Sequence, residues 1–306
     1  MTDRVLDFSM EPAKLSVRNG LLVVEVGGVE RAAIPCEEIA AVLISHRQVT
    51  FTQAVLGELA TSGAITVTCD QKSMPTAMVL PIDGHHAQAE RFRMQAALPL
   101  PRKKRLWQSV VRAKVRAQAH AMLDLTGDDQ GLAALVAKVA SGDSSNVEAR
   151  AARRYWSLVF GGEFIRSDSA DPRNAFLNYG YAVLRAITAR AICGAGLHPS
   201  FCLFHSNVHN AFGLADDLME PFRPVVDRLT VQLANDAAAA GRELTLLPEV
   251  KRQFISGIVG RLEMEGEQRT LADVLTRVAQ SLAAVISGSR DSLWLPEWRP
   301  FAEASE

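Results

Sequence analysis

The stretch KLSVRNGLLVVEVGGVERAAIP, residues 14–35, alternates apolar and polar side chains, which is the pattern of β-strands with one buried face. Asn19-Gly20 and Gly27-Gly28 interrupt it, and such pairs adopt the positive φ angles that tight hairpin turns require. Two β-hairpins are therefore predicted. Two further β-rich runs follow at residues 64–70 and 76–81, and the amphipathic segment 51–63 predicts one helix among the strands.

The composition and the apolar periodicity of the sequence change near residues 82–88. Gly and Pro become sparse, and apolar residues recur at three- and four-residue steps as far as Gly288, which is the periodicity of amphipathic helices. Helices are predicted at residues 106–125, 146–161, 173–196, 209–222, 248–265 and 271–288. The predicted fold class is α+β, with a small β-rich domain at residues 1–84 followed by a larger all-α domain at residues 85–306.

A chain of 306 residues that is 48% hydrophobic and 22% charged has the composition of a globular protein rather than a disordered one. Its apolar runs are shorter than the roughly 20 residues of a membrane-spanning helix, and it begins MTDRVLDFSM, with charges in place of a signal peptide. A cytoplasmic protein without a membrane span is expected. The four cysteines lie far apart without a CxxC pair, so reduced thiols are expected rather than disulfides or a zinc site.

The net charge of −1 says nothing about nucleic acid, but the distribution of charge along the chain does. From Arg91 to Leu123 the sequence has nine lysines and arginines and no acidic residue. A local excess of this size is typical of a surface that neutralises phosphates, and a solvated basic helix would give the same pattern. Both interpretations stay open at this point.

Glu148 lies in SSNVEARAARRYW, residues 144–156. The spacing Ser145-x-x-Glu148 fits a capping box, in which the Glu side chain only satisfies a backbone N–H at a helix start, and the residues alone favour this structural role. The alternative rests on the arginines that follow, since Glu148 could hold a cation while they hold phosphates. These arginines are Arg150, Arg153 and Arg154.

A crowded acidic helix follows His205, in the stretch HSNVHNAFGLADDLMEPFRPVVDR at residues 205–228. Asp216, Asp217 and Glu220 lie on neighbouring turns, so a cation is needed to offset their repulsion. Pro221 interrupts the helix directly after Glu220. The candidates for the cation are Arg223, Arg228 and a metal ion.

The chemistry of these side chains narrows the kind of metal. Carboxylates with one imidazole suit Mg²⁺ or Mn²⁺. A zinc pair from His205 and His209 has the spacing of two ligands on one helix face, but the HExxH pattern is absent, so this alternative is weak.

Four segments carry a family resemblance when they are taken in order and with their spacing. They are NVEARAARRYW (146–156), NAFLNYGYAVL (174–184), GLHPSFCLFHS (196–206) and NAFGLADDLMEPFRPVVD (210–227). Together they resemble the CRISPR spacer-acquisition integrase, and the last of them looks most like the type II branch of that family. The stretches at residues 69–81 and 84–95 also resemble it, so the resemblance spans nearly the whole chain.

The resemblance implies a β-rich dimerisation domain and a helical catalytic domain. By motif, it implies a metal site formed by Glu148, His205 and Glu220, with Mg²⁺ or Mn²⁺ as the ion and Asp217 as a supporting acid. The implied reaction is attack by the 3′-hydroxyl of a captured DNA fragment on a phosphodiester at a CRISPR repeat end. The implied partners are double-stranded DNA, a second copy of the chain, a small second adaptation subunit and the type II RNA-guided effector.

Several side chains remain open within this resemblance. Phe204 stands where type II relatives often have a second histidine. Tyr179 and Tyr181 could stack on a DNA end, but their apolar neighbours favour packing in the core. The expected phosphate contacts are Arg150, Arg153, Arg154, Lys103, Lys104 and Arg105.

The residues alone leave two other functions almost as well supported as an integrase. One is an unrelated metal-dependent phosphohydrolase on a helical scaffold, and the other is a non-catalytic DNA-binding scaffold with structural acids. The resemblance favours the integrase.

Overall fold

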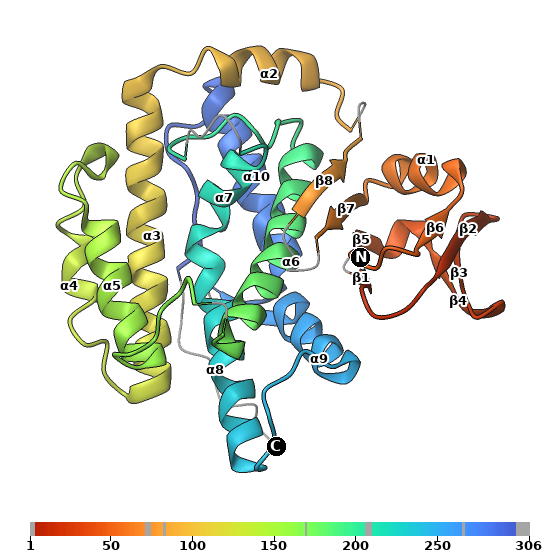
Figure 1. Ribbon diagram of the computed structural model, residues 1–306. Coiled ribbons are helices and arrows are strands. Elements are labelled where there is room, and N and C mark those ends of the chain that lie inside the picture. Colours follow the sequence, from red (N-terminus) through yellow and green to blue (C-terminus); the bar gives the residue numbers. More distant parts are fainter. Residues whose placement is uncertain are drawn as a thin grey trace.

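The computed structural model describes residues 4–70, 75–81, 84–168, 170–205, 210–264 and 267–297. Eight strands with one α-helix form the N-terminal part, and a mostly helical part follows (Figure 1). The predicted fold class, α+β with the strands first, is confirmed. Among the helices of the described ranges, none combines the length and the apolar character that are needed to cross a bilayer.

The first sheet contains both predicted hairpins. Its strands are β2 (Lys14–Arg18), β3 (Leu21–Val26), β4 (Val29–Pro35) and β6 (Thr50–Phe51), in the order β4-β3-β2-β6. Asn19 and Gly20 have φ angles of 51° and 73°, and Gly27 and Gly28 have 61° and 78°, so both turns use the left-handed backbone that the sequence predicts. The predicted helix is α1 (Gln53–Thr61).

The second sheet joins the two parts of the molecule. Its strands are β1 (Arg4–Phe8), β5 (Ile39–Ile44), β7 (Ile65–Cys69) and β8 (Pro75–Val79), in the order β1-β5-β7-β8. All six residues of β5 are buried. Val42 and Ile44 belong to the N-terminal core, whereas Ala41 and Leu43 pack with the helices, because successive side chains of a strand point to opposite faces.

The helical part is built around α6 (Pro172–Gly194), which lies between the second sheet and the remaining helices (Figure 1). The long helix α3 (Leu100–Thr126) packs against α5 (Val147–Phe160) and α8 (Arg223–Ala239). Two more helices, α9 (Pro248–Val259) and α10 (Leu271–Ser287), pack against α6. The shorter helices are α2 (Gln88–Ala96), α4 (Ala133–Val136) and α7 (Gly213–Met219).

The helical part differs from the sequence prediction beyond Val259 and directly after Phe222, and the short helices α2 and α4 were not predicted either. The helix predicted at residues 248–265 ends at Val259, and β9 (Arg261–Met264) then pairs with β10 (Glu267–Thr270) in an antiparallel hairpin. Gly260 turns the chain out of the helix with an extended backbone, at ψ 178°. Helix α8 was not predicted at all; Pro224 stands in its first turn, where a missing backbone N–H costs nothing.

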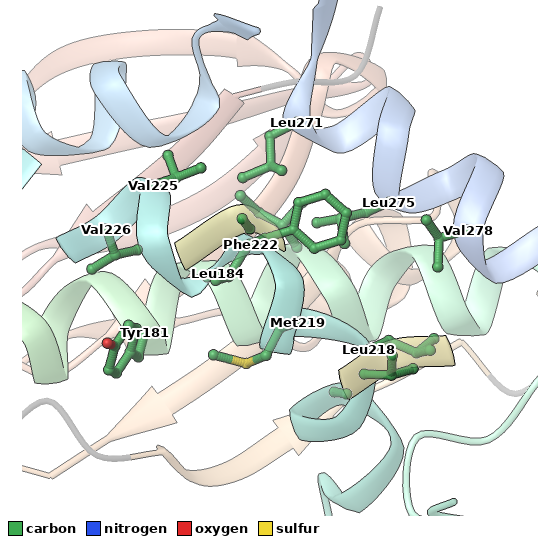
Figure 2. Close-up of a cluster of buried hydrophobic side chains, with 14 of the residues drawn as sticks. Tyr181, Leu184, Leu218, Met219, Phe222, Val225, Val226, Leu271, Leu275 and Val278 are labelled. Carbon is green, nitrogen blue, oxygen red and sulfur yellow. The ribbon is translucent and has the colours of Figure 1, made fainter. Parts of the chain in front are cut away.

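The segment that carries the acidic residues is anchored by a core between α6 and α10. Figure 2 shows Phe222 surrounded by Leu184 of α6 and by Leu271 and Leu275 of α10. Phe222 is fully buried. It belongs to the 3-10 turn η3 (Glu220–Phe222), which connects α7 to α8, so the predicted helix break at Pro221 is confirmed. Burying this ring fixes the position of Glu220, two residues earlier in the chain.

Gly180 tests how closely α6 packs against its neighbours. A Cβ at Gly180 would stand 2.5 Å from Val226 Cγ1 and 2.9 Å from the Phe254 ring. We expect Gly180→Ala to lower the free energy of unfolding by about 2 kcal/mol, because overpacking outweighs the gain in helix propensity. Urea unfolding measures this. Gly194→Ala in the same helix meets no atom within 4 Å and is the matched control; equal stability of the two variants would contradict the prediction.

Candidate functional site

A lysine in the middle of α3 joins the two glutamates that the sequence analysis selected. The Lys114 ammonium contacts Glu148 Oε1 and lies 2.5 Å from Glu220 Oε2. Burial on its own would lower the pKa of Lys114, but the two carboxylates outweigh burial and raise it. Lys114 is therefore a buried cation between two acids that are far apart in the sequence. Its place in the basic run from Arg91 to Leu123 was the only sequence signal for it.

Glu148 lies in the first turn of α5, but it does not cap that helix. The cap is the Asp143 carboxylate, which accepts the backbone N–H groups of Val147 and Glu148 at 2.9 Å each. The capping-box interpretation is therefore wrong: the Ser145 hydroxyl bonds instead to the Lys138 carbonyl, at 3.4 Å. Because Asp143 satisfies the helix start, the Glu148 side chain is free to reach Lys114.

Glu220 is buried at the break between α7 and α8, with 5% of its surface exposed. Arg223 Nε donates to its Oε1 at 2.9 Å. Burial would raise the pKa of Glu220, but Arg223 and Lys114 lower it to about 2. Its Oε2 forms an ion pair with the Lys114 ammonium.

Asp217 holds the loop that carries His205. It is fully buried and accepts the backbone N–H groups of Leu203 and Phe204, at 2.6 and 3.0 Å. The Nδ1 atom of His205 lies 2.6 Å from Asp217 Oδ1. This hydrogen bond raises the pKa of His205 against the effect of burial, and the nearby Glu220 raises it further. Asp217 therefore orients the imidazole and engages one of its two nitrogens.

The charges near Glu220 are offset by cations that were only partly predicted. Of the candidate cations, Arg223 pairs with Glu220, whereas Arg228 donates to Asp124 at 2.6 Å. Asp216 pairs with Arg185 of α6 at 2.7 Å. Arg185 has no signal in the sequence, because it lies 31 residues before Asp216 and only the folded chain brings the two together.

The predicted phosphate-binding residues do not form one group with the buried acids. Arg150, Arg153 and Arg154 are exposed on α5, whose buried residues include Val147, Ala151 and Tyr155. At about 100° per residue, each of the three arginines points away from Glu148. Any DNA they contact therefore lies along the outer surface of α5.

The predicted phosphate-binding residues of α3 lie on different faces of that helix. Lys103 lies on the same face of the helix as Trp107 and Lys114, at spacings of four and eleven residues. Lys104 and Arg105 are exposed elsewhere around the helix. Only Lys103 is therefore aligned with the buried acids.

Tyr179 and Tyr181 are buried, so the prediction that they pack in the core is confirmed. Tyr181 donates a hydrogen bond of 2.5 Å to Asp227, and Tyr179 donates one of 3.0 Å to Asp7 of β1. Burial raises the pKa of Asp227 to about 7, although the Tyr181 hydrogen bond opposes this shift. A second polar network thus lies inside the helical part, next to Glu220 and Arg223.

Within the ranges that the structure describes, no three His, Cys, Asp or Glu side chains stand close enough to form a ready-made metal site. Glu148 and Glu220 converge on the Lys114 ammonium, and His205 lies close enough to Glu220 to lower its pKa. His209 of the zinc-pair alternative lies outside the described residues. All four cysteines are free thiols, as the sequence predicts.

Comparison with known proteins shows to which family this chain is similar. The model of the family described as CRISPR associated protein Cas1 matches residues 8–245. The CRISPR-associated endonuclease Cas1 of Neisseria meningitidis serogroup C is 37% identical over 294 residues, which cover 95% of this chain and 95% of the relative.

Two solved structures share the fold. A casposase bound to its integration product has a TM-score of 0.82 at 18% identity and covers 99% of this chain and 96% of its own. A chain of a Cas6-RT-Cas1–Cas2 complex has a TM-score of 0.76 at 20% identity and covers 96% of this chain and 36% of its own. The fold is thus the one that Cas1 proteins share with the casposase. The chain belongs to the CRISPR-associated Cas1 family, which leaves an unrelated phosphohydrolase or a non-catalytic scaffold not favoured.

Replacing Lys114 tests how much its charge contributes to the stability of the site. We expect Lys114→Met to lower the free energy of unfolding by about 3 kcal/mol at pH 7, because it leaves two acids facing each other without their cation. Urea unfolding in a buffer with chelator measures this. Lys104→Met, at an exposed position of the same helix, is the control and should stay within about 0.5 kcal/mol of the wild type. Wild-type stability of Lys114→Met would show that the lysine is not needed.

The raised pKa of Asp227 predicts that the stability of the protein depends on pH. Its folded-state pKa of about 7 exceeds the value of about 3.9 in an unfolded chain. Between these values the folded state keeps a proton that the unfolded state has lost, so stability falls as the pH rises. We expect the wild type to lose about 3 kcal/mol more than Asp227→Asn between pH 4.5 and 7.5, measured by urea unfolding. The raised pKa of His205 acts in both proteins alike, and parallel pH profiles would contradict the prediction.

Proposed function

We propose that this chain is a CRISPR adaptation integrase of the type II-like branch, which inserts new DNA into a repeat by metal-dependent phosphodiester transfer. The observation that carries the proposal is the convergence of Glu148 and Glu220 on one buried point, beside a histidine that Asp217 holds in place. The Cas1 family membership and the named endonuclease relative support it.

The side chains at this point fit a divalent cation. Two carboxylates and an imidazole are ligands for Mg²⁺ or Mn²⁺, and the pairing of the acids with Lys114 supports a site that favours a cation. Glu220 is buried, and its two oxygens pair with Arg223 and Lys114, so this carboxylate already has cationic partners in the protein interior. When bound, the ion would neutralise charge on the reacting phosphate and assist the attacking or leaving oxygen.

The residues of the chain have separate roles in this proposal. Glu148, His205 and Glu220 hold the ion, and the bond from Asp217 to Nδ1 leaves the other imidazole nitrogen for coordination. Asp217 is therefore a positioning residue, since both of its oxygens already accept hydrogen bonds. Lys114 pairs with both glutamates and holds them close together.

Six basic residues are proposed to bind the DNA backbone. They are Arg150, Arg153 and Arg154 on α5 and Lys103, Lys104 and Arg105 on α3. The casposase structure contains an integration product, which supports DNA as the substrate, and the solved complex with Cas2 supports a small second subunit. We further propose a homodimer through the β-rich domain (1–84), catalysis by the helical domain (85–306), and contact with the type II RNA-guided effector.

Integration of a short duplex into a supercoiled plasmid that carries the repeat tests the function, with the second subunit and Mg²⁺ or Mn²⁺ present. We expect Glu148→Ala, His205→Ala and Glu220→Ala each to reduce integration at least about 100-fold, because each removes a ligand of the ion. Glu249→Ala, at an exposed position of α9, is the control and should integrate normally. Integration by the triple variant at the wild-type rate would disprove the proposal.

Binding assays in the same samples separate the chemistry from the phosphate contacts. The three ligand variants should bind the duplex within about twofold of the wild type, since DNA affinity comes mainly from the basic residues. Replacing Arg150, Arg153 and Arg154 together by alanine should weaken binding and reduce the slope of log K against log salt by about 0.9 per lost contact. An unchanged slope would exclude these arginines as phosphate contacts.

A further inference from the structure

Phe204 is an exposed aromatic ring with a rigid support. Half of its surface is exposed, at 50%, whereas Trp107 of α3 beneath it is 1% exposed. The two rings are stacked, with centroids 4.6 Å apart and planes only 1° from parallel. The buried indole N–H of Trp107 has no acceptor among the described residues, so ring contacts hold this pair. The outer face of Phe204 is therefore a flat, fixed apolar surface that faces solvent.

This surface lies directly beside the proposed metal ligand. The His205 ring stands edge-on to both aromatics, 5.5 Å from Phe204 and 5.2 Å from Trp107. The Phe204 backbone N–H donates to the same Asp217 carboxylate that holds the His205 imidazole. One buried acid thus positions both the exposed ring and the histidine.

A cation lies near the loop that carries Phe204. Lys103 lies one helical turn before Trp107 on the same face of α3, and it is near enough to Cys202 of the loop to lower the pKa of that thiol, although burial raises it overall. An ammonium group beside an exposed aromatic face is the combination that binds single-stranded DNA, because the base stacks while the phosphate pairs with the cation. Packing in the protein core accounts for Trp107 but does not account for the exposed Phe204.

We propose that Phe204 stacks on the 3′-terminal nucleobase of the incoming DNA strand and thereby positions the attacking 3′-hydroxyl. The inference rests on the proposed integrase function, which brings that hydroxyl to the residues around His205. The base of the nucleotide that carries this hydroxyl must then lie close to His205, and the Phe204 ring lies next to His205. A terminal base has no neighbour on its 3′ side, so one of its faces is free to stack, unlike the bases within the repeat.

A DNA fragment with 2-aminopurine as an unpaired 3′-terminal base tests this contact by fluorescence. The buffer contains EDTA, so that no metal-dependent reaction consumes the DNA. Stacking quenches the fluorescence of this base. We expect quenching by the wild type and by Phe204→Trp, its loss with Phe204→Ala and Phe204→Leu, and about tenfold weaker binding by the last two. Leu247→Ala is the control, since Leu247 is an apolar side chain that is 52% exposed directly before α9, and it should behave as wild type.

An abasic 3′-terminal nucleotide completes a double-mutant cycle. It should weaken wild-type binding by about the same tenfold factor and have no further effect on Phe204→Ala, because the stacking partner is then already missing. Equal losses in both proteins would overturn the inference. Quenching that persists in Phe204→Ala, or that occurs only with 2-aminopurine beside the attacked phosphate in the repeat, would overturn it too.

The same proteins distinguish this inference from the function on which it rests. If wild type integrates DNA and the Glu148→Ala variant does not, while Phe204→Ala keeps full quenching, the integrase function stands and the stacking contact is wrong. If the Glu148→Ala variant integrates normally, the proposed function fails, whatever the fluorescence shows. A role of Phe204 in contacting another protein subunit would appear as wild-type quenching with Phe204→Ala and a loss of assembly with the second subunit.

Discussion

The ion pairs of Lys114 are the interaction on which the arrangement of the site depends. One ammonium group contacts Glu148 at the start of α5 and Glu220 at the break between α7 and α8. Without a cation, two carboxylates this close would repel each other, and the two elements would have no electrostatic reason to meet on α3. Buried ion pairs add little net stability compared with apolar packing, so their presence here points to a role in function.

Buried neighbours make this arrangement precise, because each one fixes the position of a charged side chain of the site. Phe222, packed against α6 and α10, anchors the turn that presents Glu220 (Figure 2). Asp143 ends the loop before α5 and leaves Glu148 free, and Asp217 fixes the His205 loop through its backbone. Sites that stand on helices held by such contacts keep their geometry better than sites on free loops.

Much of the fold and part of the site could be predicted from local sequence patterns. The hairpins at Asn19-Gly20 and Gly27-Gly28 follow from backbone sterics, and the helix break follows from Pro221. The helix predicted through residues 248–265 was wrong beyond Val259, because its apolar spacing also suits a strand once a partner strand is present. The capping role of Glu148 was wrong because Asp143, five residues earlier, forms a better cap only in the folded loop.

The sequence by itself determined the division into a strand-rich first part and a helical second part. It also determined the family resemblance that selects Glu148, His205 and Glu220, because both depend on local patterns and their spacing. Only the tertiary structure decided which charges meet. It pairs Lys114 with two acids from other elements, Arg185 with Asp216, and Arg228 with Asp124 rather than with Glu220. Charged side chains can pair with any opposite charge within reach, and that reach is set by the packing of helices far apart in the chain.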